Sequence, residues 1–481
     1  MDDSFFNRWV DLEAKRQRRR GYPHFDARVN VTVQRDEIRD LLGSPDRIDA
    51  HRFLPFIAYT VETPRYKKTG KVDSTGKEIR EKVVKPRPIA YACHWDSLIY
   101  SWYAEDLTAR YERLLRDRGI HQCVSAYLRR GTSNIESAHE AFEFIRAKGE
   151  CTALAFDLTS FYDTLDHFRL KRNWMEVLDE QTLPDAHHAV FKSITRYHTV
   201  QRAVLTKLFP KYKKSVTKKL FVPVICSRRE FTELVVNAGH VEENAFVNRN
   251  CGSRRFGKRC GVPQGSPISA CLSNLYMLHF DEAMQSLALS IGGMYRRYSD
   301  DILFICPTSE AGLVKEGVLA EVLHHELILN KDKTEELVFS RERSGRLISS
   351  RVIEGVRGKP KSLQYLGFEF DGSRIYIRSS SFSRYQARLR ARIKKGLAAA
   401  SGDKSLSPVM FRRKLFNRST DKGKRNFITY AQRAAKVMSS REIMRQTKNN
   451  NKKVKELLEG MEREIDERRS ELRGRQVVTI S

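Results

Sequence analysis

The chain has 481 residues, 40% of them hydrophobic, and its 88 Lys and Arg outnumber its 59 Asp and Glu, giving a net charge of +29 at pH 7. This length allows two or three domains with a substantial core, and the hydrophobic content excludes an intrinsically disordered chain. The positive charge points to a polyanionic partner, most simply a nucleic acid. It is concentrated near the end, because residues 381–481 hold 27 Lys and Arg against 10 Asp and Glu.

The N-terminus, Met-Asp-Asp-Ser, shows neither the basic nor the apolar region of a signal peptide, so we expect a cytoplasmic protein. Residues 261–280 carry no charge, but they contain two prolines and several polar groups, so we expect no membrane span and no membrane partner. None of the eight cysteines belongs to a Cys-x-x-Cys pattern. We therefore expect buried free thiols, with a zinc site near Cys251 and Cys260 as the alternative.

The first 150 residues are predicted to combine helices with one long hairpin. Residues 1–60 are predicted to be mostly helical. Residues 56–92 are predicted to form a β-hairpin whose tip, between Arg65 and Lys85, is rich in Lys and Gly. A solvated loop and a flap that touches phosphates are both compatible with such a tip. Apolar residues at helical spacing predict two further helices, over 95–118 and 135–148.

An apolar run from Thr152 to Phe156 ends at Asp157, which predicts a buried strand that carries a carboxylate at its exit. Asp163 and Asp166 follow, and capping of a helix N-terminus is the favoured interpretation for both. Residues 196–260 show less pattern. They hold a basic run from Lys207 to Lys219 and two predicted strands, Val222 to Val224 and Phe231 to Val236. One interpretation is that residues 196–260 are an insertion.

The stretch from Gly261 to Ser269 is predicted to open a helix, with Ser266 as the N-cap and Pro267 at the first helical position. The apolar residues that follow share one face, which we expect in the core. Ser269, Ser273 and Asn274 would face elsewhere, toward a site. Gly261 and Gly265 would let the backbone approach a base pair closely.

Two apolar or aromatic runs, from Met294 to Tyr298 and from Ile302 to Ile305, flank the polar Ser299-Asp300-Asp301. This pattern predicts a β-hairpin with two adjacent carboxylates at its tip. A solvated turn is the simpler interpretation. Adjacent carboxylates repel each other unless a cation neutralises them, and hard oxygen ligands suit Mg²⁺.

The chain separates Asp157 from Asp300 by 143 residues, but if their strands are neighbours, three carboxylates converge. Three acids can hold two Mg²⁺ about 4 Å apart and so support phosphoryl transfer. A triphosphate substrate would need further cations, for which Lys85, Arg87 and Lys333 are candidates. Beyond the hairpin we expect a helix over 310–326, a strand pair around Asp371-Gly372, and basic helices from residue 381.

Taken in order, these stretches resemble the bacterial reverse transcriptases, a group that includes retron, group II intron and defence-associated enzymes. Phe156 to Asp163 is similar to the first palm motif, Gly261 to Ser269 to the Pro-Gln-Gly motif, and Tyr298 to Asp301 to the Tyr-x-Asp-Asp box. Three weaker likenesses are Lys85 to Ile89 for the fingers motif, Asn330 to Thr334 for the Lys-Thr motif, and Tyr365 to Gly367 for the primer grip. Together they cover about residues 60–375.

The resemblance implies roles by position. Asp157, Asp300 and Asp301 would be the catalytic metal ligands, with help from the Leu158 carbonyl. The nucleotide would meet Lys85, Arg87, Gln264, which places the nascent pair, and Tyr162, which excludes a ribose 2′-hydroxyl. For Lys333, a solvated cation is as good an interpretation as a role in catalysis. The primer and template would meet Tyr298, Ser299, Tyr365 and Gly367.

The implied fold is α+β: a right-hand polymerase with N-terminal helices and fingers over 1–150, an antiparallel-sheet palm over 151–375, and a basic helical thumb over 376–481. The implied activity is RNA-directed DNA synthesis with two Mg²⁺ and dNTPs, copying an associated non-coding RNA into cDNA. Residues 127–140 and the run from Tyr295 to Asp301 look most like the defence-associated group, so the expected role is anti-phage defence. A retron or group II intron-type enzyme and an RNA-binding protein with a non-catalytic palm are the alternatives. The priming group and a homo-oligomeric state stay open.

Overall fold

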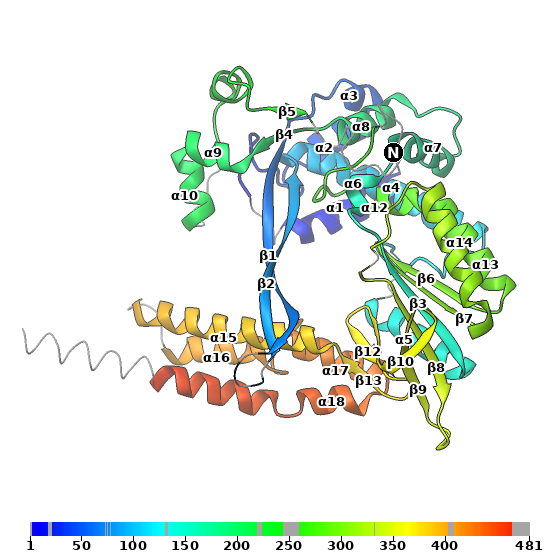
Figure 1. The fold of residues 1–481 in the computed structure, drawn as a ribbon. Coiled ribbons are helices and arrows are strands. Elements are labelled where there is room, and N and C mark those ends of the chain that lie inside the picture. Colours follow the sequence, from blue (N-terminus) through cyan, green and yellow to red (C-terminus); the bar gives the residue numbers. More distant parts are fainter. Residues whose placement is uncertain are drawn as a thin grey trace, which may run out of the picture.

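The computed structural model describes residues 2–17, 22–72, 74, 76, 78–129, 133–218, 224–243, 259–330, 332–402 and 408–463. Its elements form the α+β arrangement of a right-hand polymerase, in which fingers, an antiparallel palm sheet and a helical thumb surround a central opening between the ribbons (Figure 1). No described helix is both long enough and apolar enough to cross a bilayer.

The fingers combine a helical core with a long hairpin. Strands β1 (Phe56–Val72) and β2 (Glu78–Tyr91) pair antiparallel from Ile57 opposite Tyr91, as the sequence predicts. In Figure 1 this hairpin runs from the fingers toward the level of the thumb helices. The side chains of much of its basic tip lie outside the described part of the chain. The helices of this core are α1 (Asp3–Gln17), α2 (Arg35–Leu42), α3 (Pro45–Asp49), α4 (His94–Asp117), α7 (His167–Leu178) and α8 (Asp185–Thr195).

Residues 198–201 and 242–243 add two strands to the sheet of the fingers hairpin, whereas the sequence prediction places all of residues 151–375 in the palm. Strand β4 (His198–Gln201) pairs parallel with β1, and β5 (Glu242–Glu243) pairs with β4. The strand predicted over Phe231–Val236 is instead a π-helix, η1. A capping box of Ser227 and Glu230 starts the preceding helix, and this local signal outweighs the β-branched residues that follow. Helices α9 (Arg202–Leu208), α10 (Pro210–Lys218) and α11 (Arg228–Glu230) complete this region, while residues 222 and 223 lie outside the described ranges.

The palm is a six-stranded antiparallel sheet with the order β10-β9-β8-β3-β7-β6. Its central strand β3 (Cys151–Asp157) is buried on both faces, which explains its unbroken apolar run. Leu154 and Phe156 face one core, while Cys151 and Ala153 face another. The other strands are β6 (Met294–Tyr298), β7 (Asp301–Cys306), β8 (Glu335–Arg341), β9 (Leu347–Ile353) and β10 (Val356–Pro360).

Helices cover both faces of the palm sheet (Figure 1). On the first face lie α12 (Ser269–Tyr276), α13 (Leu278–Ser290) and α14 (Ala311–His324), which follows the short η2 (Thr308–Glu310). On the second lie α5 (Asn134–Lys148) and a small sheet of β11 (Leu363–Tyr365), β12 (Phe368–Phe370) and β13 (Ile375–Ile377). The sequence suggests a single strand over 363–370. It is broken instead by a tight turn, where Leu366 and Gly367 both have positive φ.

The thumb packs against this small sheet through α17 (Phe427–Val437) and α18 (Arg441–Thr447). Helices α15 (Ser379–Gly402) and α16 (Pro408–Ser419) pack with residues 450–463, which are also helical. Val454 and Leu458 are buried there, so this last described helix is packed, as its apolar face predicts. Among the described cysteines, Cys260 is disulfide-bonded, so the expectation of free thiols is wrong at that position. The free and buried ones are Cys93, Cys123, Cys151, Cys226, Cys271 and Cys306.

Candidate active site

The hairpin of β6 and β7 carries two carboxylates in its turn. Tyr298 pairs with Asp301, so Ser299 and Asp300 form the connection between the strands. Ser299 adopts φ of +61°, a left-handed backbone that non-glycine residues seldom use. Its main chain is therefore held in an unfavourable conformation next to two acidic residues.

Asp157, at the end of β3, lies directly opposite Asp301 in the antiparallel register of β3 and β7. Directly opposed residues of an antiparallel pair point to the same face of the sheet, so these two carboxylates share one face. The Leu158 N–H donates to the Asp300 carbonyl at 3.2 Å, and Leu158 also bridges to Leu329. The fold thus brings together three acidic residues, and the main chain of Leu158, from distant parts of the sequence.

The charges of these acids are only partly compensated. Burial first, and then the charges of Asp300 and Asp157, raise the pKa of Asp301 to about 6, against the lowering effect of Lys333. Burial and Asp157 also raise the pKa of Asp300, against the effect of Lys333. Raised carboxyl pKa values mean that the protein alone holds these groups ionised with difficulty.

The loop after α14 brings a cation to the acids. The Lys333 Nζ lies 2.5 Å from Oδ2 of Asp157, and the Asn330 Nδ2 donates to the same oxygen at 3.2 Å. The Asn330 N–H donates to the Asp157 carbonyl at 2.8 Å, which ties the loop to the end of β3. Lys333 therefore contacts the cluster directly, which a freely solvated cation would not do.

The donor set of the cluster fits a hard divalent cation, because it offers carboxylate and carbonyl oxygens that carry excess negative charge. As the side chains stand, no three His, Cys, Asp or Glu among the described residues are arranged to hold a metal ion. At Asp157, one carboxylate oxygen, Oδ2, is already contacted by Lys333 and Asn330. The donor chemistry of the cluster fits a divalent ion, and an ion at this oxygen would have to replace those two contacts.

A buried ion pair supports the hairpin from the opposite face of the sheet. Arg297 and Asp281 of α13 have fully buried side chains joined by two hydrogen bonds, Nε to Oδ1 at 2.7 Å and Nη2 to Oδ2 at 2.6 Å. The Arg297 Nη1 donates to the Asn274 Oδ1 at 3.1 Å and to the Ser299 carbonyl at 3.3 Å. The guanidinium therefore fixes the main chain of the turn that carries the two acids.

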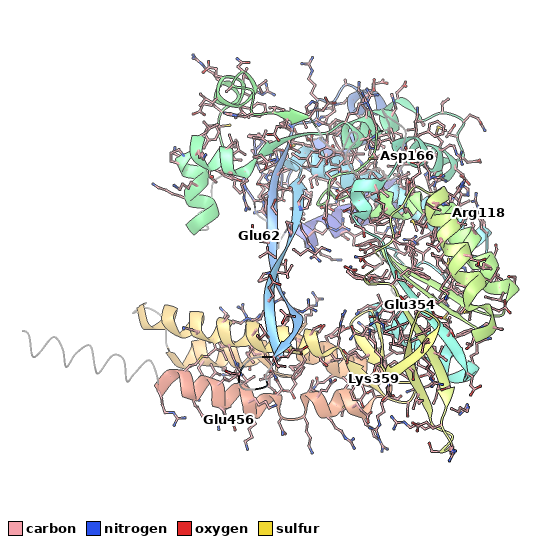
Figure 2. The ribbon with its side chains drawn as sticks, viewed as in Figure 1. Glu62, Arg118, Asp166, Glu354, Lys359 and Glu456 are labelled. Atoms are coloured by element: carbon pink, nitrogen blue, oxygen red, sulfur yellow. The ribbon has the colours of Figure 1, made fainter. Side chains whose placement is uncertain are left out.

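Tyr162 lies beside this turn, in the short helix α6 (Phe161–Thr164) that follows Asp157. Burial raises the pKa of its phenol, and the side chains of Tyr127, Ser273 and Ser299 lie close enough to affect that pKa. Further along, Asp166, which is labelled in Figure 2, caps α7: it accepts a hydrogen bond from the Arg169 N–H at 2.8 Å. Asp163 lies in the first turn of α6, where burial raises its pKa to about 6.

The segment that contains Gln264 joins the palm to the fingers hairpin. The Ala90 N–H of β2 donates to the Gln264 carbonyl at 2.9 Å. A side chain at Gly265, whose φ is +125°, would meet the Ala90 carbonyl oxygen at 2.6 Å. Gly265 thus allows close packing of two protein segments, a reason that the sequence analysis did not foresee. Lys85 and Arg87 are exposed on β2, which leads into this contact.

Helix α12 begins at Ser269, later than the predicted start at Ser266 and Pro267. Shifts of one or two residues at a helix end are common, and here Ser269 donates its hydroxyl to the Pro263 carbonyl at 2.6 Å. Gly261 has φ of +90°, and its N–H donates to the Leu165 carbonyl at 2.8 Å. The Gly261 contact fixes the start of the Gly261–Ser269 stretch against the segment after α6, and the Ser269 contact closes the stretch on itself.

The turn between β11 and β12 lies between the site and the thumb. Tyr365 is buried, and Asp301 and Tyr298 are among the groups that raise its pKa after burial itself, so it lies within electrostatic range of the acids. Leu366 and Gly367 line a cavity of about 1160 Å³ that opens between palm and thumb. Among the described residues, these cationic side chains also line it: Arg384, Arg388, Arg392, Arg413, Lys414, Arg418, Lys424 and Arg425.

The structure adds residues that the sequence analysis missed. Arg297 and Asp281 left one usable signal, an arginine at a core-facing position of an apolar strand, which requires a buried partner. Tyr127, whose φ is +61°, left no such signal, because nothing in its local sequence indicates a left-handed backbone. Asn274, which the sequence analysis placed toward the site, contacts Arg297.

Residues 112–370, more than half of the chain, match the family described as "Reverse transcriptase (RNA-dependent DNA polymerase)". Among solved structures, apo telomerase from Candida tropicalis shows 14% identity, covers 82% of this chain and 61% of its own, and has a TM-score of 0.41. Telomerase from Candida albicans, in complex with a fragment of telomeric RNA, shows 12% identity, covers 94% and 61%, and has a TM-score of 0.37. The chain thus spans about three fifths of the length of these proteins. No curated protein matches the sequence.

Proposed function

Since the chain belongs to the reverse transcriptase family, we propose that it synthesises DNA on an RNA template. The observation that carries this proposal is the register that sets Asp157 opposite Asp301, with Asp300 in the adjoining turn. Acids that the protein neutralises only in part lower the stability of the fold. Clusters of such perturbed carboxylates are typical of functional sites.

The three carboxylates and the Leu158 carbonyl are the proposed ligands of two Mg²⁺. When bound, these ions would lower the pKa of the primer 3′-hydroxyl and neutralise charge on the departing pyrophosphate. Members of the family use divalent metal ions, and the oxygen donors here favour Mg²⁺ over softer metals. Arg297 acts indirectly, because it holds the Ser299 carbonyl and so orients Asp300 and Asp301.

The nucleotide would lie between the acids and the fingers. Lys333, already at the cluster, would exchange its contact with Asp157 for the triphosphate when the metal arrives. Arg87 and Lys85, exposed on β2, would meet the same phosphates, and Gln264 would position the nascent pair. Tyr162 would exclude a ribose 2′-hydroxyl, a role supported by its place directly beside the Ser299 turn.

The primer end would lie near Tyr298, Ser299, Tyr365 and Gly367. Of these, Gly367 lines the cationic cavity, and Tyr365 lies within electrostatic range of Asp301. That cavity combines its cationic side chains with Tyr385, Phe427 and Tyr430, a composition suited to phosphates and stacked bases. We propose that it holds the RNA-containing duplex, with an affinity that falls steeply as salt rises. A dedicated non-coding RNA as template and a role in anti-phage defence rest on the sequence resemblance alone.

Primer extension tests the proposal. Purified full-length protein is incubated with an RNA template, a labelled DNA primer, dNTPs and Mg²⁺, and elongated primer is measured. Asp300→Asn and Asp301→Asn should each reduce the rate by at least about a hundredfold, the scale for loss of a group that stabilises developing charge. Both variants should bind RNA as the wild type does.

Wild-type synthesis rates in both variants would remove the acids from catalysis. No extension by the wild type on any RNA template would instead favour an RNA-binding protein with a non-catalytic palm. Sequencing the RNA that copurifies with the protein distinguishes a dedicated non-coding RNA from a retron template or a self-splicing intron.

A further inference from the structure

Backbone hydrogen bonds join the short helix α6 and the residues after it to the segment that leads into Gln264. The Gly261 N–H donates to the Leu165 carbonyl at 2.8 Å. One residue further, the Val262 N–H donates to the Tyr162 carbonyl at 2.9 Å. The main chain of the residue proposed to exclude a ribose is thus bonded to the segment proposed to position the nascent pair.

The side chain of His167, the first residue of α7, adds one more contact to this pairing. Its Nε2 lies 2.7 Å from the carbonyl oxygen of Gly261. A carbonyl oxygen can only accept a hydrogen bond, so Nε2 must carry a proton and donate it. The imidazole is buried, and burial lowers its pKa, so near pH 7 the ring is neutral with its one proton on Nε2.

Gly261 is the residue of this segment that most needs such a contact. Its φ is +90°, and a glycine loses more conformational freedom on folding than any other residue. The bond from His167 holds the peptide group after Gly261, and the bond to Leu165 holds the peptide group before it. Three residues further, the Gln264 carbonyl accepts from the Ala90 N–H, so the conformation at Gly261 determines how the segment reaches strand β2 of the fingers.

We propose that His167 is a positioning residue for the incoming nucleotide, whose Nε2–H group holds the Gly261 carbonyl and with it the segment that places Gln264. This inference rests on the proposed polymerase function. His167 acts through Gly261 and is a ligand of neither the nucleotide nor the metal. If the segment adopts the receiving conformation for only a fraction of the time, the apparent affinity for the nucleotide falls by that fraction. Loss of the bond should therefore raise KM for the dNTP and leave kcat, which depends on the acids, almost unchanged.

Primer extension with saturating primer and template measures KM and kcat for the dNTP. His167→Leu replaces the ring with an apolar side chain and removes the donor. It should raise KM by about two- to tenfold, the effect of one hydrogen bond of ordinary strength, with kcat within about twofold of the wild type. His167→Gln restores a donor, because its amide nitrogen lies as many bonds from the main chain as Nε2 does. Its KM should lie within about twofold of the wild-type value.

His325→Leu is the matched control. His325 is also buried, and its Nδ1 contacts the Glu321 carbonyl at 2.9 Å where α14 ends. The substitution removes a comparable contact that does not involve Gly261. It should lower Tm, measured by circular dichroism, and leave KM unchanged, because a lower fraction of folded enzyme reduces the apparent kcat and not KM. If His167→Leu does not fold, His167→Asn takes its place, because its amide nitrogen lies one bond too close to the main chain to reach the carbonyl.

A KM within twofold of the wild type in the donor-free variant would overturn the inference. Equal rises of KM in His167→Leu and His167→Gln, or a rise of the same size in His325→Leu, would overturn it too, because the donated hydrogen bond would then not be the cause. Each of these results leaves the polymerase proposal intact, since the enzymes still synthesise DNA. Failure of the wild type to synthesise DNA at all would overturn both.

Discussion

Replacing Asp281 with Asn probes the buried ion pair beneath the acidic turn. The side chains of Asp281 and Arg297 are both fully buried, so the substitution leaves a guanidinium in the core without its counter-charge. Breaking a buried pair from one side costs about 3–5 kcal/mol in the free energy of unfolding. One kcal/mol corresponds to about 2–4 °C in Tm for a unit of 150–250 residues. We therefore expect Tm to fall by about 6–20 °C, the product of these two estimates.

Thermal unfolding followed by circular dichroism measures this shift. Glu456→Gln is the surface control, because Glu456 lies on the outer side of the thumb and pairs with Lys452 at 4.0 Å with both side chains largely exposed (Figure 2). Such pairs contribute at most about 1 kcal/mol. A double variant, Asp281→Leu with Arg297→Met, removes both charges and should recover most of the lost stability. If Asp281→Asn melts within 2 °C of the wild type, the ion pair does not support the palm as argued.

The remaining predictions concern the acids, their cation and the thumb. Without metal and above pH 6, Asp301→Asn should melt at a higher temperature than the wild type. Folding raises the pKa of Asp301 to about 6. The protonated carboxyl group therefore contributes to folding stability at low pH, and this contribution is lost as pH rises through that value. Equal melting at pH 8 in EDTA would contradict this. Lys333→Gln should move the acid limb of the pH–rate profile to higher pH, because Lys333 lowers the pKa of Asp300 and Asp301. An acid limb at the same pH as in the wild type would show that Lys333 does not act on these acids. Arg388→Gln and Arg418→Gln should each reduce the slope of log Kd for RNA against log salt by about one, and unaltered slopes would place the RNA elsewhere.

Local patterns in the sequence predict the parts of the site that a strand or a turn determines. The apolar run before Asp157 identifies a strand buried on both faces, and the polar break between two apolar runs identifies the hairpin that carries Asp300 and Asp301. The long fingers hairpin follows in the same way from its two extended runs. In each case the pattern lies within a few residues of the feature it predicts.

Features that depend on tertiary contacts could not be predicted in this way. The pairing of Arg297 with Asp281 depends on how α13 packs against β6, and the contact of Gly265 with Ala90 depends on where the fingers meet the palm. The π-helix over Phe231–Val236 has the composition of a strand, and only its capping box favours a helix. Tyr127 has no signal at all, because hydrogen bonds to distant segments impose its conformation.

Single-turnover primer extension by the Asp157→Asn variant tests the central claim most directly, because Asp157 joins the cluster only through the fold. With saturating Mg²⁺ and an RNA template, we expect the variant to elongate the primer at least about a hundredfold more slowly than the wild type. Its affinity for the RNA should equal that of the wild type. Elongation at a rate within a few-fold of the wild type would contradict a shared role of Asp157 with Asp300 and Asp301.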